Sequence, residues 1–299
     1  MSLIKAKKST RYPTLEVRKY SKEVFFKNLW HTDPKLLESR GHVYDANGNL
    51  VVNAFTKVFN RFENGTDINR DEWCIGVQKI NGFMASATYV PSLDEVIVST
   101  TGSLDSPFVD MAKKWIDANP KVEKKIRDHY KDVGSPVTWM FEVCDPSDPH
   151  IVPEKFGLYL IGQRYVRDDY PYFSTDDTEW MLDCDAQDMG VMRPSWRVAR
   201  FSDFVQEVKT VRHEGFVIYG PESRTVLKMK SPWYLSRKMI ARMADKKFEE
   251  WLDNGTLKEK VDEEFYDVVE CLTIDPITRG QFMKMDEQGK LDWLTNFFS

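Results

Sequence analysis

Up to about residue 230, hydrophobic residues occur mostly in short runs bounded by turn residues, a pattern typical of β-strands. The predicted strands are residues 73–78, 84–89, 95–100, 137–143, 157–161, 215–219 and 226–230. This part of the chain is therefore expected to form a body rich in β-sheet.

One long helix is predicted to interrupt these strands. Ser106 is suited to cap it, Pro107 suits its first position, and apolar residues then recur at helical spacing. Beyond Pro120 the same helix is expected to continue as a basic run. Such a run is usually a solvated face and less often an anion-binding surface. Its basic residues are Lys121, Lys124, Lys125, Arg127 and Lys131.

At Ser231-Pro232 the spacing of apolar residues changes to the period of a helix. The apolar stripe that begins there ends near Asn254. Two further helical stretches are predicted at residues 261–272 and 278–298. The chain is thus expected to contain a sheet-rich domain, residues 1–230, and a small all-helical domain, residues 231–299. An acidic stretch at residues 167–188 is predicted to be an exposed loop, with a carboxylate metal cluster as the weaker interpretation.

Composition narrows the classes of function. The chain has 299 residues, of which 41% are hydrophobic and 30% charged, as in ordinary folded proteins. Its net charge of −5 excludes a molecule coated with positive charge, so any contact with nucleic acid must use a local patch. No apolar run approaches the roughly 18 residues of a membrane span. The first ten residues also lack a signal-peptide core, so we expect a soluble cytoplasmic protein without a membrane partner.

Several common sites lack their residues. The four cysteines form no CxxC pair, and the five histidines show no metal-ligand spacing. The motifs GxGxxG, GxxxxGK[ST], HExxH and GxSxG are absent, which excludes the usual dinucleotide, P-loop, zinc-protease and hydrolase-elbow sites.

The segment with the clearest chemistry is Lys79-Ile80-Asn81-Gly82, which forms a turn between two predicted strands. A lysine in such a turn is a candidate covalent nucleophile. The pattern Lys-x-x-Gly also occurs at Lys131, but that copy follows a helix, so the two are not equivalent.

Further charged residues stand at predicted strand ends. Glu142 closes one strand, and Glu214 precedes Gly215 at the start of another. Lys228 and Lys230 are two residues apart in a strand, so both side chains lie on one face while the apolar residues between and before them face the core. Two ammonium groups on one face suit a phosphate.

In order and spacing, these segments resemble the covalent nucleotidyltransferases, which comprise ATP-dependent RNA and DNA ligases and capping enzymes. Within that superfamily the chain resembles most the bacteriophage RNA ligase 1 family, over about residues 35–235. The upstream elements Arg-Gly and Lys-Phe-Phe-Asn of that family are matched as well. The matching segments are Ser39-Arg40-Gly41, Phe55-Thr56-Lys57-Val58-Phe59-Asn60-Arg61-Phe62, Lys79-Ile80-Asn81-Gly82, Phe141-Glu142-Val143, Glu214-Gly215-Phe216-Val217 and Leu227-Lys228-Met229-Lys230-Ser231-Pro232-Trp233-Tyr234.

The resemblance implies an α+β nucleotidyltransferase fold with two largely antiparallel sheets, in which residues 1–230 form the adenylyltransferase domain. It implies an ATP-dependent RNA ligase that joins 5′-phosphate and 3′-hydroxyl ends through a lysyl-AMP intermediate, in RNA or tRNA repair. The implied cofactors are ATP and Mg²⁺, which Mn²⁺ can replace, and the implied partner is an RNA end, single-stranded or in a tRNA loop. If the enzyme is encoded by a phage, it would act in the host cytoplasm.

Roles follow from the resemblance for individual residues. Lys79 would be the nucleophile, and Lys228 and Lys230 would favour its neutral amine and neutralise the α-phosphate. Glu214 would help hold the metal ion, and Glu142 would bind the ribose. The remaining candidates for nucleotide binding are Arg40 and Lys57 on phosphate or ribose, Phe59 beside the nucleotide or in the core, and Gly82 in the turn.

The chain departs from the family pattern in three places. Asn81 stands where the family usually has aspartate, and residues 99–101 are Ser-Thr-Thr where lysines for the leaving phosphates are expected. His150 replaces an expected arginine. Contacts to pyrophosphate are therefore expected from elsewhere.

Two alternatives remain at this stage. A DNA ligase or capping enzyme would use the same lysine chemistry, but such enzymes usually append an OB-fold where this chain reads as helical. A nucleic-acid-binding module without catalysis is the other alternative, and Asn81 is the main argument for it. The sequence indicates neither the particular RNA, nor the tolerance of DNA ends, nor the oligomeric state.

Overall fold

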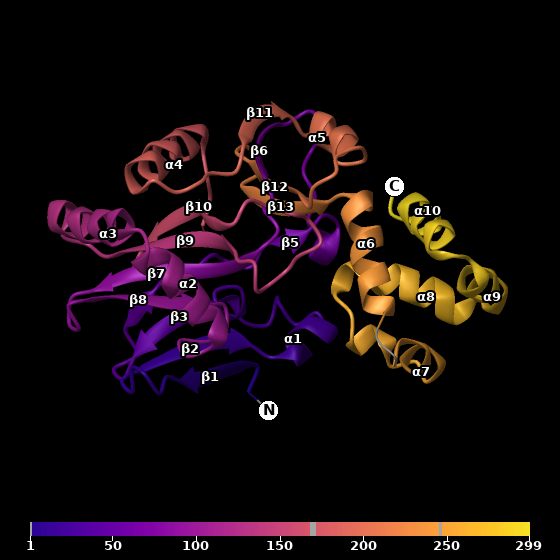
Figure 1. The fold of residues 1–299 in the computed structure, drawn as a ribbon, viewed down its shortest axis with the longest axis horizontal. Helices are drawn as coiled ribbons and strands as arrows, with labels where there is room; N and C mark the ends of the chain where they lie inside the picture. The colour runs from indigo at the N-terminus through magenta and orange to yellow at the C-terminus, as the bar shows by residue number, and fades with distance from the viewer. Residues whose placement is uncertain (1, 168–171, 245–246) are drawn as a thin grey trace. The chain divides into compact units, whose positions relative to one another are not determined.

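A computed structural model describes residues 2–167, 172–244 and 247–299, which form three β-sheets and a set of helices (Figure 1). Contacts divide the chain into two compact units. The first contains Met1–Phe59 and Ile80–Val198, and the second contains Asn60–Lys79 and Ala199–Ser299. The prediction of two sheets is wrong, because the N-terminal residues form a sheet of their own.

The first unit contains two four-stranded sheets. One has the order β1 (Ile4–Lys8), β2 (Leu15–Tyr20), β3 (Arg40–Asp45), β4 (Leu50–Val52). The other has the order β10 (Gly157–Tyr165), β9 (Val137–Cys144), β7 (Phe83–Val90), β8 (Glu95–Thr100). Within both sheets the strand pairs are antiparallel.

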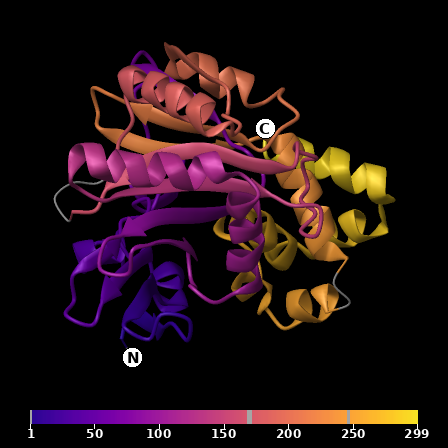
Figure 2. The ribbon, with the colours of Figure 1, turned by 60° about the vertical axis from the view of Figure 1, so that its left-hand side comes forward.

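Both faces of the sheet β10-β9-β7-β8 are covered. On one face, Trp139 and Phe141 pack against helices α2 (Pro107–Asp117), α3 (Pro120–Val133) and α4 (Asp176–Met189). Figure 2 shows the ribbons of the sheet and its helices from a second side. On the other face, Ile97 packs with residues of β2, β3 and β4. The helix α1 (Lys22–Phe26) and the 3₁₀ turn Pro34–Leu36 belong to a separate small core.

The second unit contains a five-stranded sheet and most of the helices. The strand order is β11 (Trp196–Arg200), β6 (Trp73–Gln78), β12 (Gly215–Gly220), β13 (Thr225–Lys230), β5 (Phe59–Asn60). Helix α5 (Phe201–Glu207) covers it through Phe201 and Phe204. The other helices of this unit are α6 (Pro232–Met243), α7 (Phe248–Asp253), α8 (Tyr266–Ile274), α9 (Pro276–Lys284) and α10 (Glu287–Phe297), with 3₁₀ turns at Glu63–Gly65, Leu257–Glu259 and Glu263–Phe265.

Three helical predictions are wrong. The stretch predicted at residues 278–298 is divided between α9 and α10 at Met285, whose backbone is extended. The predicted long helix consists of α2 and α3, because Asn119 precedes a proline and adopts non-helical angles (φ −125°, ψ 85°). The apolar stripe predicted after Ser231 is divided between α6 and α7, and the link between them contains residues 245–246, which lie outside the described part of the chain.

The acidic stretch is not a loop throughout. Residues 176–189 form α4, which buries Leu182, Ala186 and Met189 against the sheet, while three of its six carboxylates are exposed. The spacing of these apolar side chains, four residues and then three, favours a helix, but the acidic composition obscured it. Residues 168–171 of the predicted loop lie outside the described part.

The basic run on α3 is a solvated face. Lys125 pairs with Asp185 and Asp188 of α4, and Arg127 pairs with Glu123 and Asp94. These partners neutralise the run, which supports the solvated-face interpretation over an anion-binding surface. Within the described ranges, no helix is both long and apolar enough to cross a membrane.

The boundary placed at residue 230 remains a prediction. That prediction concerns which segments form separate domains. The two compact units are divided at other positions, because each contains two separate stretches of the chain.

Candidate active site

Lys79 is held at the end of a buried strand. In the sheet of the second unit, Gln78 of β6 pairs with Phe216 of β12. One residue further on, the Lys79 backbone N–H donates to the Gly215 carbonyl at 2.9 Å. The predicted turn between two strands is therefore confirmed, and its lysine is fixed by its own backbone.

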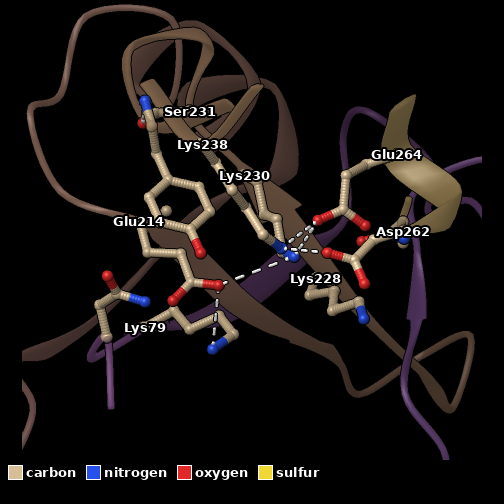
Figure 3. Close-up of polar contacts among 12 residues, drawn as sticks. Lys79, Glu214, Lys228, Lys230, Ser231, Lys238, Asp262 and Glu264 are labelled. Carbon is tan, nitrogen blue, oxygen red and sulfur yellow. Dashed lines mark hydrogen bonds and ion pairs between the residues drawn. The ribbon is translucent and has the colours of Figure 1, made fainter. Parts of the chain in front are cut away.

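Glu214 is the carboxylate that faces Lys79. Its Oε1 atom lies 3.1 Å from Nζ of Lys79 and 3.8 Å from Nζ of Lys230, and the residue is only 2% exposed (Figure 3). Burial alone would raise the pKa of Glu214, but the two ammonium groups lower it below its ordinary value. Glu214 is thus a buried anion shared by two lysines.

The alternation predicted for β13 is confirmed. Leu227 and Met229 are buried in the core of the second unit, whereas Lys228 and Lys230 lie on the other face. Lys228 faces Glu263 at 3.8 Å, and Lys230 faces Glu264 at 2.5 Å. Lys230 therefore lies near both Glu214 and Glu264, whereas Lys228 lies near Glu263. Glu263 and Glu264 belong to the C-terminal helical segment.

Gly215 permits the close packing of this strand end. Its φ is +137°, and a Cβ atom there would lie 1.9 Å from the carbonyl oxygen of Met229. Ser231 follows β13 and precedes α6. Its backbone N–H donates to the Glu214 carbonyl at 2.9 Å, and its hydroxyl caps α6. Two strand ends and a helix start thus converge around Glu214.

In the first unit, Glu142 and Gly82 contact each other. The Gly82 backbone N–H donates to Oε1 of Glu142 at 3.1 Å, and Glu142 is 8% exposed. A Cβ atom on Gly82 would lie 2.3 Å from the carbonyl oxygen of Val143. Glycine is therefore required by the close approach of β9 to the turn after the lysine.

Asn81 is buried in the same turn. Its Oδ1 accepts from the Val152 N–H at 3.0 Å, and its own backbone N–H donates to Glu154 at 3.3 Å. With Glu142 bound to the next residue, two carboxylates already lie at this turn. The uncharged side chain of Asn81 therefore avoids a third carboxylate in this turn.

Three further candidates lie in the first unit. Lys57 is 7% exposed, and its Nζ lies 4.9 Å from the ring centroid of Phe59 and 5.3 Å from that of Trp30. Phe59 packs in the core with Trp30. Arg40 begins β3 and makes no ion pair with any residue in the described ranges. The predicted contacts of these three with nucleotide stay predictions.

The second Lys-x-x-Gly copy does not form a comparable site. Lys131 lies in the last turn of α3, and its side chain is 71% exposed beside Asp128. It serves as a natural control for Lys79.

The chain resembles known proteins in sequence and in fold. A family model described as RNA ligase matches residues 38–239. The chain belongs to the RNA ligase family. Two solved structures titled "Archaeal ATP-dependent RNA ligase", forms 1 and 2, have TM-scores of 0.57 and 0.55 and identities of 14% and 12%. They cover 99% and 98% of this chain and 74% and 73% of their own.

A Naegleria gruberi RNA ligase, solved as an apo mutant, has a TM-score of 0.46 at 14% identity, over 62% of this chain and 57% of its own. No curated protein sequence matches the chain significantly.

The family match confirms the resemblance and the prediction of an RNA ligase. The α+β nucleotidyltransferase fold with largely antiparallel sheets is confirmed by the topology and by its likeness to ATP-dependent RNA ligases. The family also decides against a DNA ligase or a capping enzyme.

The residues of this RNA ligase that sequence reasoning missed are Lys238, Asp262, Glu263 and Glu264. Lys238 of α6 contacts Glu264 at 2.9 Å and Asp262 at 2.8 Å. The run Asp262-Glu263-Glu264 is visible in the sequence, but nothing local indicates that it pairs with lysines about 30 residues earlier.

Proposed function

We propose that this RNA ligase takes AMP from ATP onto Lys79, transfers it to an RNA 5′-phosphate, and then joins that end to a 3′-hydroxyl. The observation that supports this most is the placement of Lys79 Nζ beside buried Glu214, with Lys230 on the same carboxylate. A lysine held by its backbone and side chain next to a second ammonium group suits attack on a phosphate.

In the first step, the neutral amine of Lys79 attacks the α-phosphorus of ATP. A P–N bond forms, the P–O bond to pyrophosphate breaks, and the proton released from the nitrogen would pass to Glu214, whose Oε1 lies 3.1 Å from Nζ, and from there to solvent. Lys230, with Lys228 on the same face, would neutralise negative charge on the α-phosphate as five-coordinate phosphorus develops.

In the second step, an oxygen of the RNA 5′-phosphate attacks the same phosphorus, and the P–N bond to Lys79 breaks. In the third step, the 3′-hydroxyl attacks the 5′-phosphate and AMP leaves. Glu142 would bind the ribose and Arg40 and Lys57 the phosphates or ribose, with Phe59 packed beside the nucleotide and Gly82 admitting it closely.

Glu214 is the carboxylate that would hold a divalent cation at this site. Among residues 2–167, 172–244 and 247–299, no three His, Cys, Asp or Glu side chains are grouped to hold a metal. Mg²⁺ commonly binds one or two carboxylates together with substrate phosphates, so the single carboxylate suffices when ATP is present. Bound there, Mg²⁺, or Mn²⁺ in its place, would supply charge neutralisation.

We propose broken RNA as the substrate, either a single strand or a cleaved tRNA loop, so that the reaction serves RNA repair in the cytoplasm. For a phage-encoded enzyme this is the cytoplasm of the host. Ligation of matched RNA and DNA strands tests the substrate: sealing of RNA alone supports it, and preferential sealing of DNA contradicts it.

The mechanism is tested with ATP labelled at the α-phosphate, Mg²⁺ and protein freed of AMP by treatment with pyrophosphate. We expect denaturing gels to show label on the wild type and on Lys131→Ala, but none on Lys79→Ala. Label on Lys79→Ala would overturn the site assignment. Unlabelled wild type that still binds RNA would favour the binding module without catalysis. Lys230→Ala should slow the labelling step by at least about a hundredfold, because a charge contact in a dry site is lost.

A further inference from the structure

A chain of alternating charges extends from the candidate nucleophile toward the C-terminal helical segment. Oε1 of Glu264 lies 2.5 Å from Nζ of Lys230 and 2.9 Å from Nζ of Lys238, and Asp262 lies 2.8 Å from Nζ of Lys238 (Figure 3). The order of contacts is Lys79, Glu214, Lys230, Glu264, Lys238, Asp262. Lys238 therefore shares a carboxylate oxygen with a lysine already assigned to phosphate binding.

These groups are mostly shielded from solvent. The side chains of Lys230, Lys238 and Glu264 are 10%, 18% and 7% exposed. Burial alone would lower the pKa of Lys238, but Glu264 and Asp262 raise it above its ordinary range. A buried ammonium group needs an anion beside it, because an uncompensated charge in such a place is costly. Any ligand that takes the carboxylates' place must itself be an anion.

At one segment of the family pattern this chain lacks the cations expected for such an anion. Where lysines for the leaving phosphates are expected, residues 99–101 are Ser-Thr-Thr. Departure of pyrophosphate needs cations near the β- and γ-phosphates, because negative charge develops there in the transition state. Lys238, which shares the Glu264 carboxylate with Lys230, is a cation close to the proposed phosphate site.

We propose that Lys238 is a third phosphate-binding lysine, which takes the β- and γ-phosphates of ATP, and that Glu264 and Asp262 hold these lysines until the triphosphate displaces them. This inference rests on the proposed use of ATP. Lysine binds phosphates as a compact point charge, and a polyphosphate carries more charge and more acceptor oxygens than two carboxylates. When the triphosphate replaces the carboxylates of Glu264 and Asp262, the charges of the buried lysines stay neutralised.

The segment that carries the carboxylates is short. Asp262 precedes the single 3₁₀ turn Glu263–Phe265, and Phe265 is fully buried beneath it. Asp262 keeps a side chain that is 40% exposed, and Glu263 faces Lys228 at 3.8 Å. Asp262, Glu263 and Glu264 thus each contact one or two of the lysines at positions 228, 230 and 238. To release these lysines to the triphosphate, only this turn of the backbone has to move.

Calorimetric titration with inorganic pyrophosphate tests the proposal without any chemistry. Pyrophosphate binds only those wild-type molecules in which the carboxylates have left the lysines. Its apparent affinity is therefore lowered in proportion to the fraction of such molecules. We expect Lys238→Met to weaken pyrophosphate binding about tenfold, and Glu264→Gln and Asp262→Asn each to tighten it by about as much. The control is Glu270→Gln, which removes an exposed partner of Lys258 in the same helical segment and should leave binding unchanged.

The sign of the Glu264 effect is decisive. If Glu264 only positioned Lys230, Glu264→Gln would weaken pyrophosphate binding, and that result overturns the proposal, as does a wild type that fails to bind pyrophosphate. Thermal unfolding followed by circular dichroism shows whether each variant is folded. Should Glu264→Gln not fold, Asp262→Asn, which changes a half-exposed carboxylate, decides the question.

A second measurement separates this inference from the proposed function. Lys79→Ala should bind pyrophosphate about as well as the wild type even though it forms no lysyl-AMP. If the wild type forms lysyl-AMP, Glu264→Gln should lower KM for ATP about tenfold. Unchanged KM would contradict displacement by ATP.

Discussion

Nζ of Lys79 lies 3.1 Å from Oε1 of Glu214, and the two residues are fixed by the same strand end, since the Lys79 N–H donates to the carbonyl of Gly215. The proposed nucleophile and its counter-ion are therefore tied to the same backbone segment. Any change that moves the start of β12 also moves the amine that we expect to attack ATP.

Glu214→Gln should impair both stability and the first step. The substitution leaves Lys79 without its carboxylate and Lys230 with Glu264 alone, so we expect the free energy of unfolding to fall by about 3 kcal/mol. Lysyl-AMP formation should slow by at least about a hundredfold. Urea unfolding and the rate of label transfer measure the two effects.

The matched control is Glu222→Gln, in the exposed turn between β12 and β13. It should change neither quantity measurably. If Glu214→Gln adenylylated at the rate of this control, Glu214 would have no part in the reaction.

Gly215→Ala should destabilise the second unit. A Cβ atom would lie 1.9 Å from the Met229 carbonyl oxygen, and φ is +137°, which L residues rarely adopt. We expect a loss of about 2–3 kcal/mol in unfolding free energy and a lower yield of lysyl-AMP. Gly280→Ala in α9, where nothing lies within 4 Å, should be neutral or slightly stabilising in the same assay. Equal stability of the two variants would contradict the steric argument.

Asn81→Asp tests the departure in the lysine turn. Aspartate can still accept from the Val152 N–H, but it adds a third carboxylate beside Glu142 and Glu154. We expect a loss of about 1 kcal/mol at neutral pH that diminishes in acid as the carboxylates are protonated. Chemical denaturation at neutral and mildly acidic pH measures this. A variant more stable than the wild type at neutral pH would show that charge repulsion does not select asparagine here.

Acid should remove a stabilising contribution of Glu38. Burial alone would raise the pKa of Glu38, but the hydrogen bond with His42 and the charge and hydrogen bond of Arg164 lower it to about 2. The folded-state pKa lies below the unfolded one, so the contribution is present above about pH 4.5 and is lost as pH falls toward 2.

Between pH 7 and pH 3, the wild type should therefore lose about 2 kcal/mol more unfolding free energy than Glu38→Gln. Chemical denaturation at both values tests this, with Glu259→Gln, an exposed carboxylate, behaving like the wild type. The same acid loss in Glu38→Gln and the wild type would show that other groups govern acid stability.

Local features of the site could be predicted from the sequence. The strands Trp73–Gln78 and Glu95–Thr100 begin and end where the pattern predicts, and the opposite orientation of Met229 and Lys230 follows from the two-residue period of a strand. Gly215 after Glu214 likewise marks a close approach of backbones. Each of these depends on neighbours only a few residues away.

Errors arose where the composition of a segment opposed its packing. Residues 176–189 read as a loop because they are acidic, yet three apolar side chains on one helical face are buried. The proline after Asn119 keeps the backbone of Asn119 out of the helical range and so separates α2 from α3, while the apolar spacing runs on across it.

The sequence by itself determined the RNA ligase family, the lysine in its turn and the face on which Lys228 and Lys230 lie, because motif order and strand alternation are local properties of the chain. Only the tertiary structure decided which carboxylates neutralise the lysines. Glu214 reaches Lys79 across two paired strands, and Glu264 reaches Lys230 from 34 residues further on. The physical reason is that charge pairing depends on distance and burial, which many carboxylates could satisfy in the unfolded chain and which only the packed chain assigns to particular ones.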